Sequence, residues 1–133
     1  MPFIPKGKTA QTWLCSFTTG ASDAAGTAES VSIQQINGQP VVPVVYAFQK
    51  LVIKRIYTSA VQGTDFLIQP IVNNNPQGNS PTANSVVVTN QSMPPFSELK
   101  LKAGSNISFV AYLLAAVTAV TTEKFYVQVE YQE

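Results

Sequence analysis

The sequence predicts an all-β protein that folds as a single antiparallel β-sandwich, jelly-roll-like, with about eight strands. Three observations support this prediction. Several segments alternate apolar and polar residues with a period of two, which is the pattern of a half-buried strand. Short segments rich in Gly, Pro, Asn and Ser separate them, as in sandwiches and barrels. The 133 residues make one domain, which at this size buries roughly two-thirds of the surface that the unfolded chain exposes.

In the first half of the chain, segments that break regular structure separate the expected strands. Residues 19–27, rich in Gly, Ala, Ser and Asp, follow the first of these strands. Asn37 and Gly38 lie between the second and the third, and this dipeptide favours a hairpin turn because both residues tolerate a positive φ. The expected strands are residues 12–18, 30–36, 41–48 and 51–57.

The second half ends on the clearest alternation in the sequence. Phe125, Val127 and Val129 fall on one face of an extended chain, whereas Gln128 falls on the other. A helix is the alternative for residues 110–122, but their β-branched residues and the lack of an N-cap favour a strand followed by a loop. The expected strands are residues 65–72, 85–89, 99–102, 106–114 and 125–132.

The sandwich domain is expected to span residues 10–133 and to follow an extended N-terminal arm, residues 1–9. The prolines and the glycine of this arm favour an extended chain that leaves the sandwich. Phe3 and Ile4 are apolar and would be exposed to water on an isolated arm. We therefore expect these two side chains to pack onto another subunit, or the arm to become ordered only in the assembly.

Composition excludes several classes of function. Only 11% of the residues are charged and the formal net charge is +1, which argues against a specific nucleic-acid binder, because such proteins need clustered cations. The absence of histidine rules out Ser-His-Asp and Cys-His catalysis and histidine metal sites. The first residues lack the apolar stretch of a secretory signal peptide, and the longest nearly apolar run, residues 107–120, is too short to span a membrane.

The remaining reactive side chains do not indicate an enzyme. Cys15 is the one cysteine, so the chain can form neither an internal disulfide nor a multi-cysteine zinc site, and its neighbours Trp13 and Phe17 predict a buried core residue. The seven Asp and Glu residues are dispersed, and no spacing indicates the carboxylate pair of a hydrolase or a calcium loop. We therefore expect no catalytic residue, no metal and no cofactor.

Apolar residues on both faces of one expected strand predict an interface. Val110, Tyr112 and Leu114 alternate with apolar residues of the opposite face, so one of the two sets points away from the core. Such a surplus favours a homo-oligomer, with a trimer preferred over a pentamer. Arg55 is a candidate for pairing with a carboxylate of a neighbouring subunit, and the alternative is a solvated charge. Because it adjoins Lys54 in an expected strand, the two side chains should face opposite sides.

The C-terminal part of the chain resembles a known group of proteins. Residues 99–109 (LKLKAGSNISF), a loop of small residues and the last strand, residues 125–131 (FYVQVEY), resemble the end of small β-sandwich virion proteins of bacterial and archaeal viruses. These include capsid, decoration and spike proteins. The resemblance implies a non-enzymatic structural role through protein–protein assembly, with further copies of the chain and other virion proteins as partners. It also implies a location in the virion after assembly in the host cytoplasm.

A low charge content suits such assembly, because many copies can pack side by side without strong repulsion. The alternative function is a carbohydrate- or receptor-binding module, for which a host-surface glycan would be the partner. That alternative predicts aromatic side chains clustered on one face or among the loops, although aromatics on strands more often pack in the core or across strands. The candidate aromatic residues are Tyr46, Phe48, Tyr57, Tyr112, Tyr126 and Tyr131.

Overall fold

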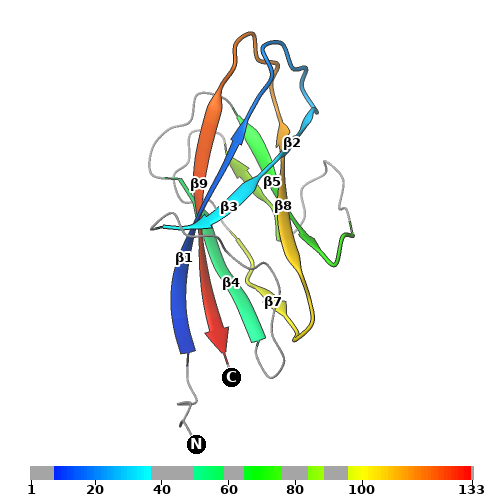
Figure 1. The fold of residues 1–133 in the computed structure, drawn as a ribbon. Coiled ribbons are helices and arrows are strands. Elements are labelled where there is room, and N and C mark those ends of the chain that lie inside the picture. Colours follow the sequence, from blue (N-terminus) through cyan, green and yellow to red (C-terminus); the bar gives the residue numbers. More distant parts are fainter. Residues whose placement is uncertain (1–7, 37–49, 59–64, 76–83, 89–95, 133) are drawn as a thin grey trace, which may run out of the picture.

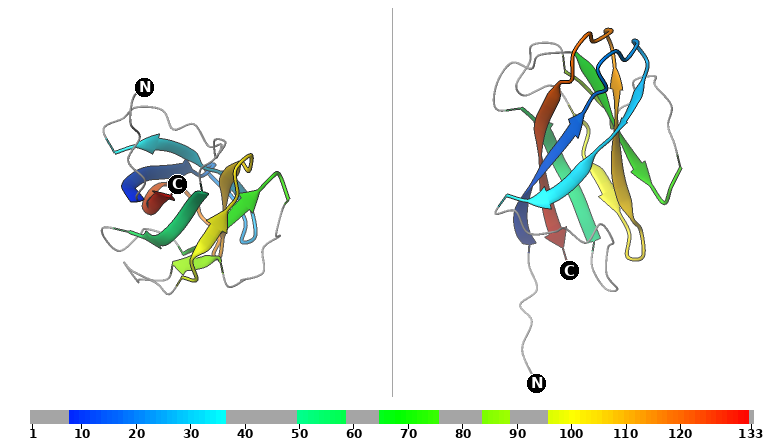
Figure 2. Two further views of the ribbon diagram at one scale, coloured as in Figure 1. Left: turned by 90° about the horizontal axis from the view of Figure 1, so that it is seen from below. Right: turned by 45° about the horizontal axis from the view of Figure 1, so that its top comes forward.

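The computed structural model describes residues 8–36, 50–58, 65–75, 84–88 and 96–132, and these residues form two antiparallel β-sheets that face each other (Figures 1 and 2). No helix occurs among them, and hence none that could cross a membrane. The five-stranded sheet has the order β3-β1-β9-β4-β7, and the four-stranded sheet has the order β2-β8-β5-β6. The strands are β1 (Lys8–Thr18), β2 (Ala28–Ser30), β3 (Ser32–Gln35), β4 (Lys50–Tyr57), β5 (Phe66–Val72), β6 (Val86–Val88), β7 (Leu99–Leu101), β8 (Ile107–Leu113) and β9 (Thr122–Gln132).

The pairing of the strands follows the jelly-roll scheme. The innermost pair along the chain is β5 with β6, and around it lie in turn the pairs β4 with β7, β2 with β8 and β1 with β9. All four pairs are antiparallel, so the chain resembles one long hairpin rolled up into two sheets. Strand β3 is an addition at the edge of the five-stranded sheet, where it pairs with β1. The predicted all-β, jelly-roll-like sandwich is thereby confirmed.

One predicted strand, residues 30–36, is wrong as a single element. Ser30 belongs to β2 and pairs with Val110 in the four-stranded sheet, whereas Ser32 belongs to β3 and pairs with Ser16 in the five-stranded sheet. The chain therefore changes sheets at Val31, as strands at the corners of sandwiches do. Both Val31 and Ile33 are partly buried against the core, so the alternation of buried and exposed residues continues through the corner. The sequence pattern therefore does not show where the chain changes sheets.

The other predicted strands in the described residues are present, with shifts at their ends. Strand β1 begins at Lys8, which pairs with Gln132, so residues 8 and 9 belong to the sandwich and not to the expected arm. Strand β9 begins at Thr122, so the end of β8 and the loop at residues 114–121 stand in place of the helical alternative for residues 110–122. The expected strand at residues 41–48, and Phe3 and Ile4 of the arm, lie outside the described residues.

The core lies between the sheets and is centred on phenylalanine side chains from both of them. The Phe66 ring lies 4.9 Å from that of Phe17 and 6.4 Å from that of Phe125, and the Phe109 ring lies 6.2 Å from that of Phe125 (centroid distances). Cys15 is fully buried in this core, and burial raises the pKa of its thiol to about 12. A thiol that stays protonated at neutral pH is a poor nucleophile, so Cys15 acts as a core residue.

Candidate functional site

The two outer faces of the sandwich differ in charge. In the five-stranded sheet, Lys54, Arg55, Lys100, Lys124 and Glu130 lie at outward positions, because core-facing residues flank them in the register. In the four strands of the other sheet, Glu29 is the one charged residue, and its pairing with the core residue Ala111 turns it inward. The described strands of the four-stranded sheet thus carry no charged residue at an outward position.

The outward face of the four-stranded sheet, the uncharged face, holds the interface residues predicted on β8. Val110 pairs with Ser30 and Gln69, and Tyr112 pairs with Ala28 and Leu67. Val110 and Tyr112 are partly buried, and Leu114, just after the strand, is 42% exposed. Leu67 and Gln69, which lie on the same face, are already fully buried within the chain. The outward residues that a partner could still cover are Ser108, Val110 and Tyr112 of β8 and Leu114 just after it.

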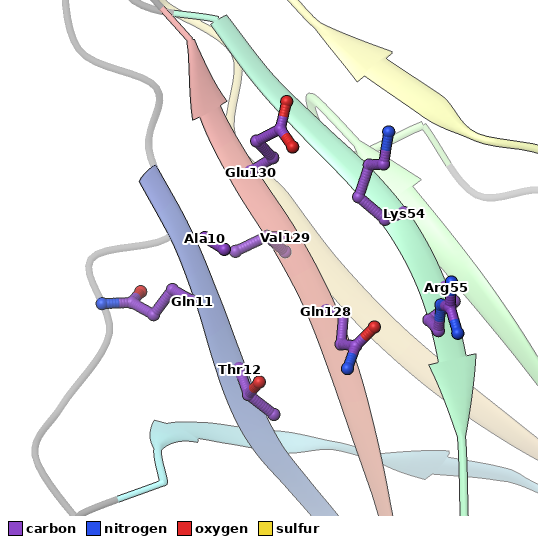
Figure 3. A pocket seen from close by; sticks show the side chains of 8 residues that line it. All are labelled: Ala10, Gln11, Thr12, Lys54, Arg55, Gln128, Val129 and Glu130. Carbon is purple, nitrogen blue, oxygen red and sulfur yellow. The ribbon is translucent and has the colours of Figure 1, made fainter. Parts of the chain in front are cut away.

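On the five-stranded sheet, a β-bulge in β4 changes the predicted orientation of two charged residues. Ile53 and Ile56 both face the core with no exposed surface, although three positions separate them. The register moves from Ile53 opposite Val129 to Arg55 opposite Gln128, which leaves Lys54 as the extra residue. The prediction that Lys54 and Arg55 face opposite sides is therefore wrong, because both line the same hollow (Figure 3).

This hollow has a volume of about 350 Å³ and lies over three adjacent strands, β1, β9 and β4 (Figure 3). Strand β1 contributes residues 10–12, with the short side chains of Ala10 and Thr12, and β9 and β4 contribute longer polar side chains together with Val129. The hollow therefore offers both hydrogen-bond donors and acceptors. Its lining residues are Ala10, Gln11, Thr12, Lys54, Arg55, Gln128, Val129 and Glu130.

The charges around the hollow nearly balance. Lys54 Nζ lies 2.8 Å from Glu98 Oε1, and this hydrogen bond raises the pKa of Lys54. Glu130 accepts a hydrogen bond from Gln132, with 2.8 Å between Nε2 and Oε1, which orients its carboxylate. Arg55 adds a second cation at the exposed end of the wall. The site therefore combines two cations with two carboxylates and has little preference for a ligand of either charge.

A stacked tyrosine pair adjoins the hollow. Tyr57 and Tyr126 pair across β4 and β9, with ring centroids 5.3 Å apart and planes inclined by 26°. Each lies two residues from Arg55 or Gln128, respectively, and so belongs to the next row of the same outer face, at a strand spacing of about 7 Å. The remaining described tyrosines lie elsewhere, Tyr112 on the opposite outer face and Tyr131 against the core. The aromatic platform expected from the sequence is thus reduced to this pair, with Tyr46 and Phe48 outside the described residues.

A carboxyl pair, Asp23 and Glu29, lies beside two neighbouring loops at one end of the sandwich. The loop between β1 and β2 lies beside the loop between β8 and β9 (Figure 1), and the Val117 N–H donates to the Asp23 carbonyl at 2.9 Å. The Asp23 side chain accepts from the Gly20 N–H at 2.7 Å and is hydrogen-bonded to Glu29. Burial, together with the neighbouring Asp23, raises the pKa of Glu29 to about 7, while the hydrogen bonds from Glu29 and Gly20 lower that of Asp23. Sequence reasoning missed this pair because a turn separates its members.

The raised pKa of Glu29 predicts a dependence of stability on pH. The folded protein keeps a proton on Glu29 that the unfolded chain releases, so the free energy of unfolding should fall as pH rises from about 4.5 to about 7. In urea titrations across this range, Glu29→Gln should flatten this decline, because glutamine is uncharged throughout. Glu98→Gln, a change to an exposed acid at a distance from the loops, should keep it. An equal decline in wild type and Glu29→Gln would contradict the assignment.

The predicted site residues do not form one patch. Arg55 lies on the outer face of the five-stranded sheet, and Val110, Tyr112 and Leu114 lie on or beside that of the other sheet. Among the residues that the structure describes, no group of three or more Cys, Asp and Glu residues could hold a metal ion. No family model, curated protein or solved structure matches this chain. The two outer faces of the sandwich are therefore the surfaces that bear on function.

Proposed function

We propose that the chain is a non-enzymatic structural protein of a virion, as a shell, decoration or spike subunit that assembles by protein–protein contacts. The observation that supports this proposal is the uncharged face, one side of a jelly roll on which Val110, Tyr112 and Leu114 are accessible beside the small residues Ala28, Ser30 and Ser108. Jelly rolls occur in viral capsid domains and in lectins, so the fold favours this role by analogy only.

The energetics of association favour the uncharged face over the charged one. Burying apolar surface contributes roughly 25 cal/mol per Å², whereas each charge that is moved out of water must be paired to offset its desolvation. On the uncharged face, a second subunit would cover valine, tyrosine and leucine side chains without desolvating a charge. We therefore assign the homo-oligomer contact, in a trimer in preference to a pentamer, to this face.

Arg55 keeps its expected role in this proposal. It lies on the opposite outer face, where it would pair with a carboxylate of a neighbouring subunit, because each subunit of a ring contacts its two neighbours through two different surfaces. Other virion proteins are further partners in this proposal, and the virion, assembled in the host cytoplasm, is the proposed location. A carbohydrate-binding role is the second candidate, and the specific observation that favours it is the Tyr57–Tyr126 pair beside the hollow.

The proposed role can be tested on particles. Virus particles purified by density gradient from cells that express the gene should contain this polypeptide at a constant ratio to the other particle proteins, measured by quantitative mass spectrometry. A loosely attached contaminant would be removed by washing in high salt, whereas a structural subunit would persist. Absence of the polypeptide from purified, salt-washed particles would contradict the proposal.

A further inference from the structure

We propose that the hollow on the outer face of the five-stranded sheet, together with the Tyr57–Tyr126 pair, binds a neutral oligosaccharide of hexose units. The polar side chains of the hollow and the two tyrosine rings lie in consecutive rows of the same sheet face. This site lies opposite the uncharged face, so the inference does not depend on the proposed structural role.

The polar wall matches the chemistry of sugar hydroxyl groups. Each hydroxyl both donates and accepts a hydrogen bond, and neighbouring hydroxyls on a ring can be held by the two polar atoms of one planar side chain. Gln128 offers an amide donor and an acceptor, and Thr12 offers a hydroxyl group. Glu130 offers a carboxylate acceptor whose Oε1 is already oriented by Gln132. Lys54 and Arg55 add donors from the other side of the hollow (Figure 3).

The charge balance selects a neutral ligand. The ammonium group of Lys54 already binds Glu98 at 2.8 Å, and Glu130 lies in the hollow itself. A phosphate, sulfate or carboxylate group would gain from Arg55 but would be repelled by Glu130, and it would have to compete with Glu98 for Lys54. A neutral polyhydroxylated ligand is not repelled by Glu130 and does not compete with Glu98 for the charge of Lys54.

The tyrosine pair supplies the second element of sugar recognition. The face of a hexose ring that carries C–H groups packs on the electron-rich face of an aromatic ring. The stacked rings of Tyr57 and Tyr126 cover each other's inner faces, so this contact uses the outer face of one of the two rings. The pair lies about 7 Å along the strands from the Arg55–Gln128 row, a separation longer than one ring. The ligand should therefore contain at least two hexose units, one in the hollow and one on the tyrosines.

The site is pre-organised by the sheet. All the described side chains that form it project from paired strands, and the β-bulge at Lys54 brings two consecutive long side chains to the same face. The stacked rings and the Glu130–Gln132 hydrogen bond restrict side-chain freedom before a ligand arrives. Binding on such a surface needs little ordering of the protein, which favours measurable affinity from few contacts.

The test measures binding of defined oligosaccharides to the full chain. An array of neutral oligosaccharides of glucose, galactose, mannose and N-acetylhexosamines should contain binders, and isothermal titration with the strongest should show saturable binding. Gln128→Ala and Tyr126→Ala should each weaken this affinity by about tenfold or more, and Tyr126→Phe, which keeps the ring, should retain most of it. Lys124→Ala, an outward change on the same strand beyond the tyrosine row, should leave the affinity unchanged.

Three results would overturn the proposal: no binding to any neutral oligosaccharide, stronger binding to sulfated or sialylated controls, or unchanged affinity in Gln128→Ala. Far-UV circular dichroism of each variant separates a lost site from a lost fold, and Gln128→Ala provides a partly exposed change should Tyr126→Ala unfold. The oligomeric mass of the same variants should equal that of wild type. A failure of sugar binding is therefore distinguishable from a failure of assembly.

Discussion

Phe125→Ala is expected to lower the free energy of unfolding by about 3–5 kcal/mol, the range for removing a fully buried phenylalanine. Phe125 lies on β9, the strand between β1 and β4, and has no exposed surface. Its ring meets those of Phe66 and Phe109 from the opposite sheet, so the substitution opens a cavity where the two sheets join. Urea unfolding followed by Trp13 fluorescence, which reports on a fully buried indole, measures the loss.

Two matched variants test whether the loss of stability comes from the buried ring of Phe125. Phe125→Leu keeps most of the buried volume and should lose clearly less stability than Phe125→Ala. Lys124→Ala changes the exposed neighbour on the same strand and should stay within about 0.5 kcal/mol of wild type. A loss below about 1 kcal/mol for Phe125→Ala would mean that the sheets are not joined at this aromatic cluster.

Val110→Lys is expected to convert the oligomer into monomers at micromolar concentration. The substitution places a charge in the middle of the uncharged face, between Ser30 and Gln69, and a subunit contact there would have to desolvate it without a partner. The isolated domain should tolerate the change, because Val110 is partly exposed and a lysine can extend its ammonium group into water.

The matched control for this variant lies on the other outer face. Lys124→Glu changes a charge by two units at an exposed position of the five-stranded sheet and should leave the oligomeric mass unchanged. Loss of the oligomer in Lys124→Glu together with an unchanged oligomer in Val110→Lys would place the contact on the charged face.

The sequence predicted the strands well wherever one face alone is buried. In β9 the alternation of apolar and polar residues from Phe125 to Val129 marks each side of the strand, and the observed burial follows it residue by residue. In β8 the burial also alternates, although apolar residues lie on both of its faces. The strand prediction failed at Val31, where the chain passes from one sheet to the other. The residues before and after this corner keep the same alternation although they pair with different strands. A period of two reports which side a residue faces and not which sheet it joins.

The sequence indicates the bulge in β4 at the candidate site, but not the hollow or the stacked tyrosine pair. Ile53 and Ile56 are separated by three positions, which breaks the period of two and indicates a bulge that brings Lys54 and Arg55 to one face. The hollow itself could not be predicted, because it depends on the register between β1 and β9, whose paired residues are more than a hundred positions apart throughout the ladder. The stacking of Tyr57 on Tyr126 could not be predicted either, because it depends on the register between β4 and β9.

The mass of the wild-type protein in solution tests the central claim, assembly through the uncharged face, most directly. Sedimentation equilibrium at micromolar concentration should show a closed oligomer, with the mass of a trimer expected first, and Val110→Lys should sediment as a folded monomer under the same conditions. A wild-type protein that is strictly monomeric over this concentration range would contradict the claim. It would leave the sugar-binding face as the better-supported functional surface of the molecule.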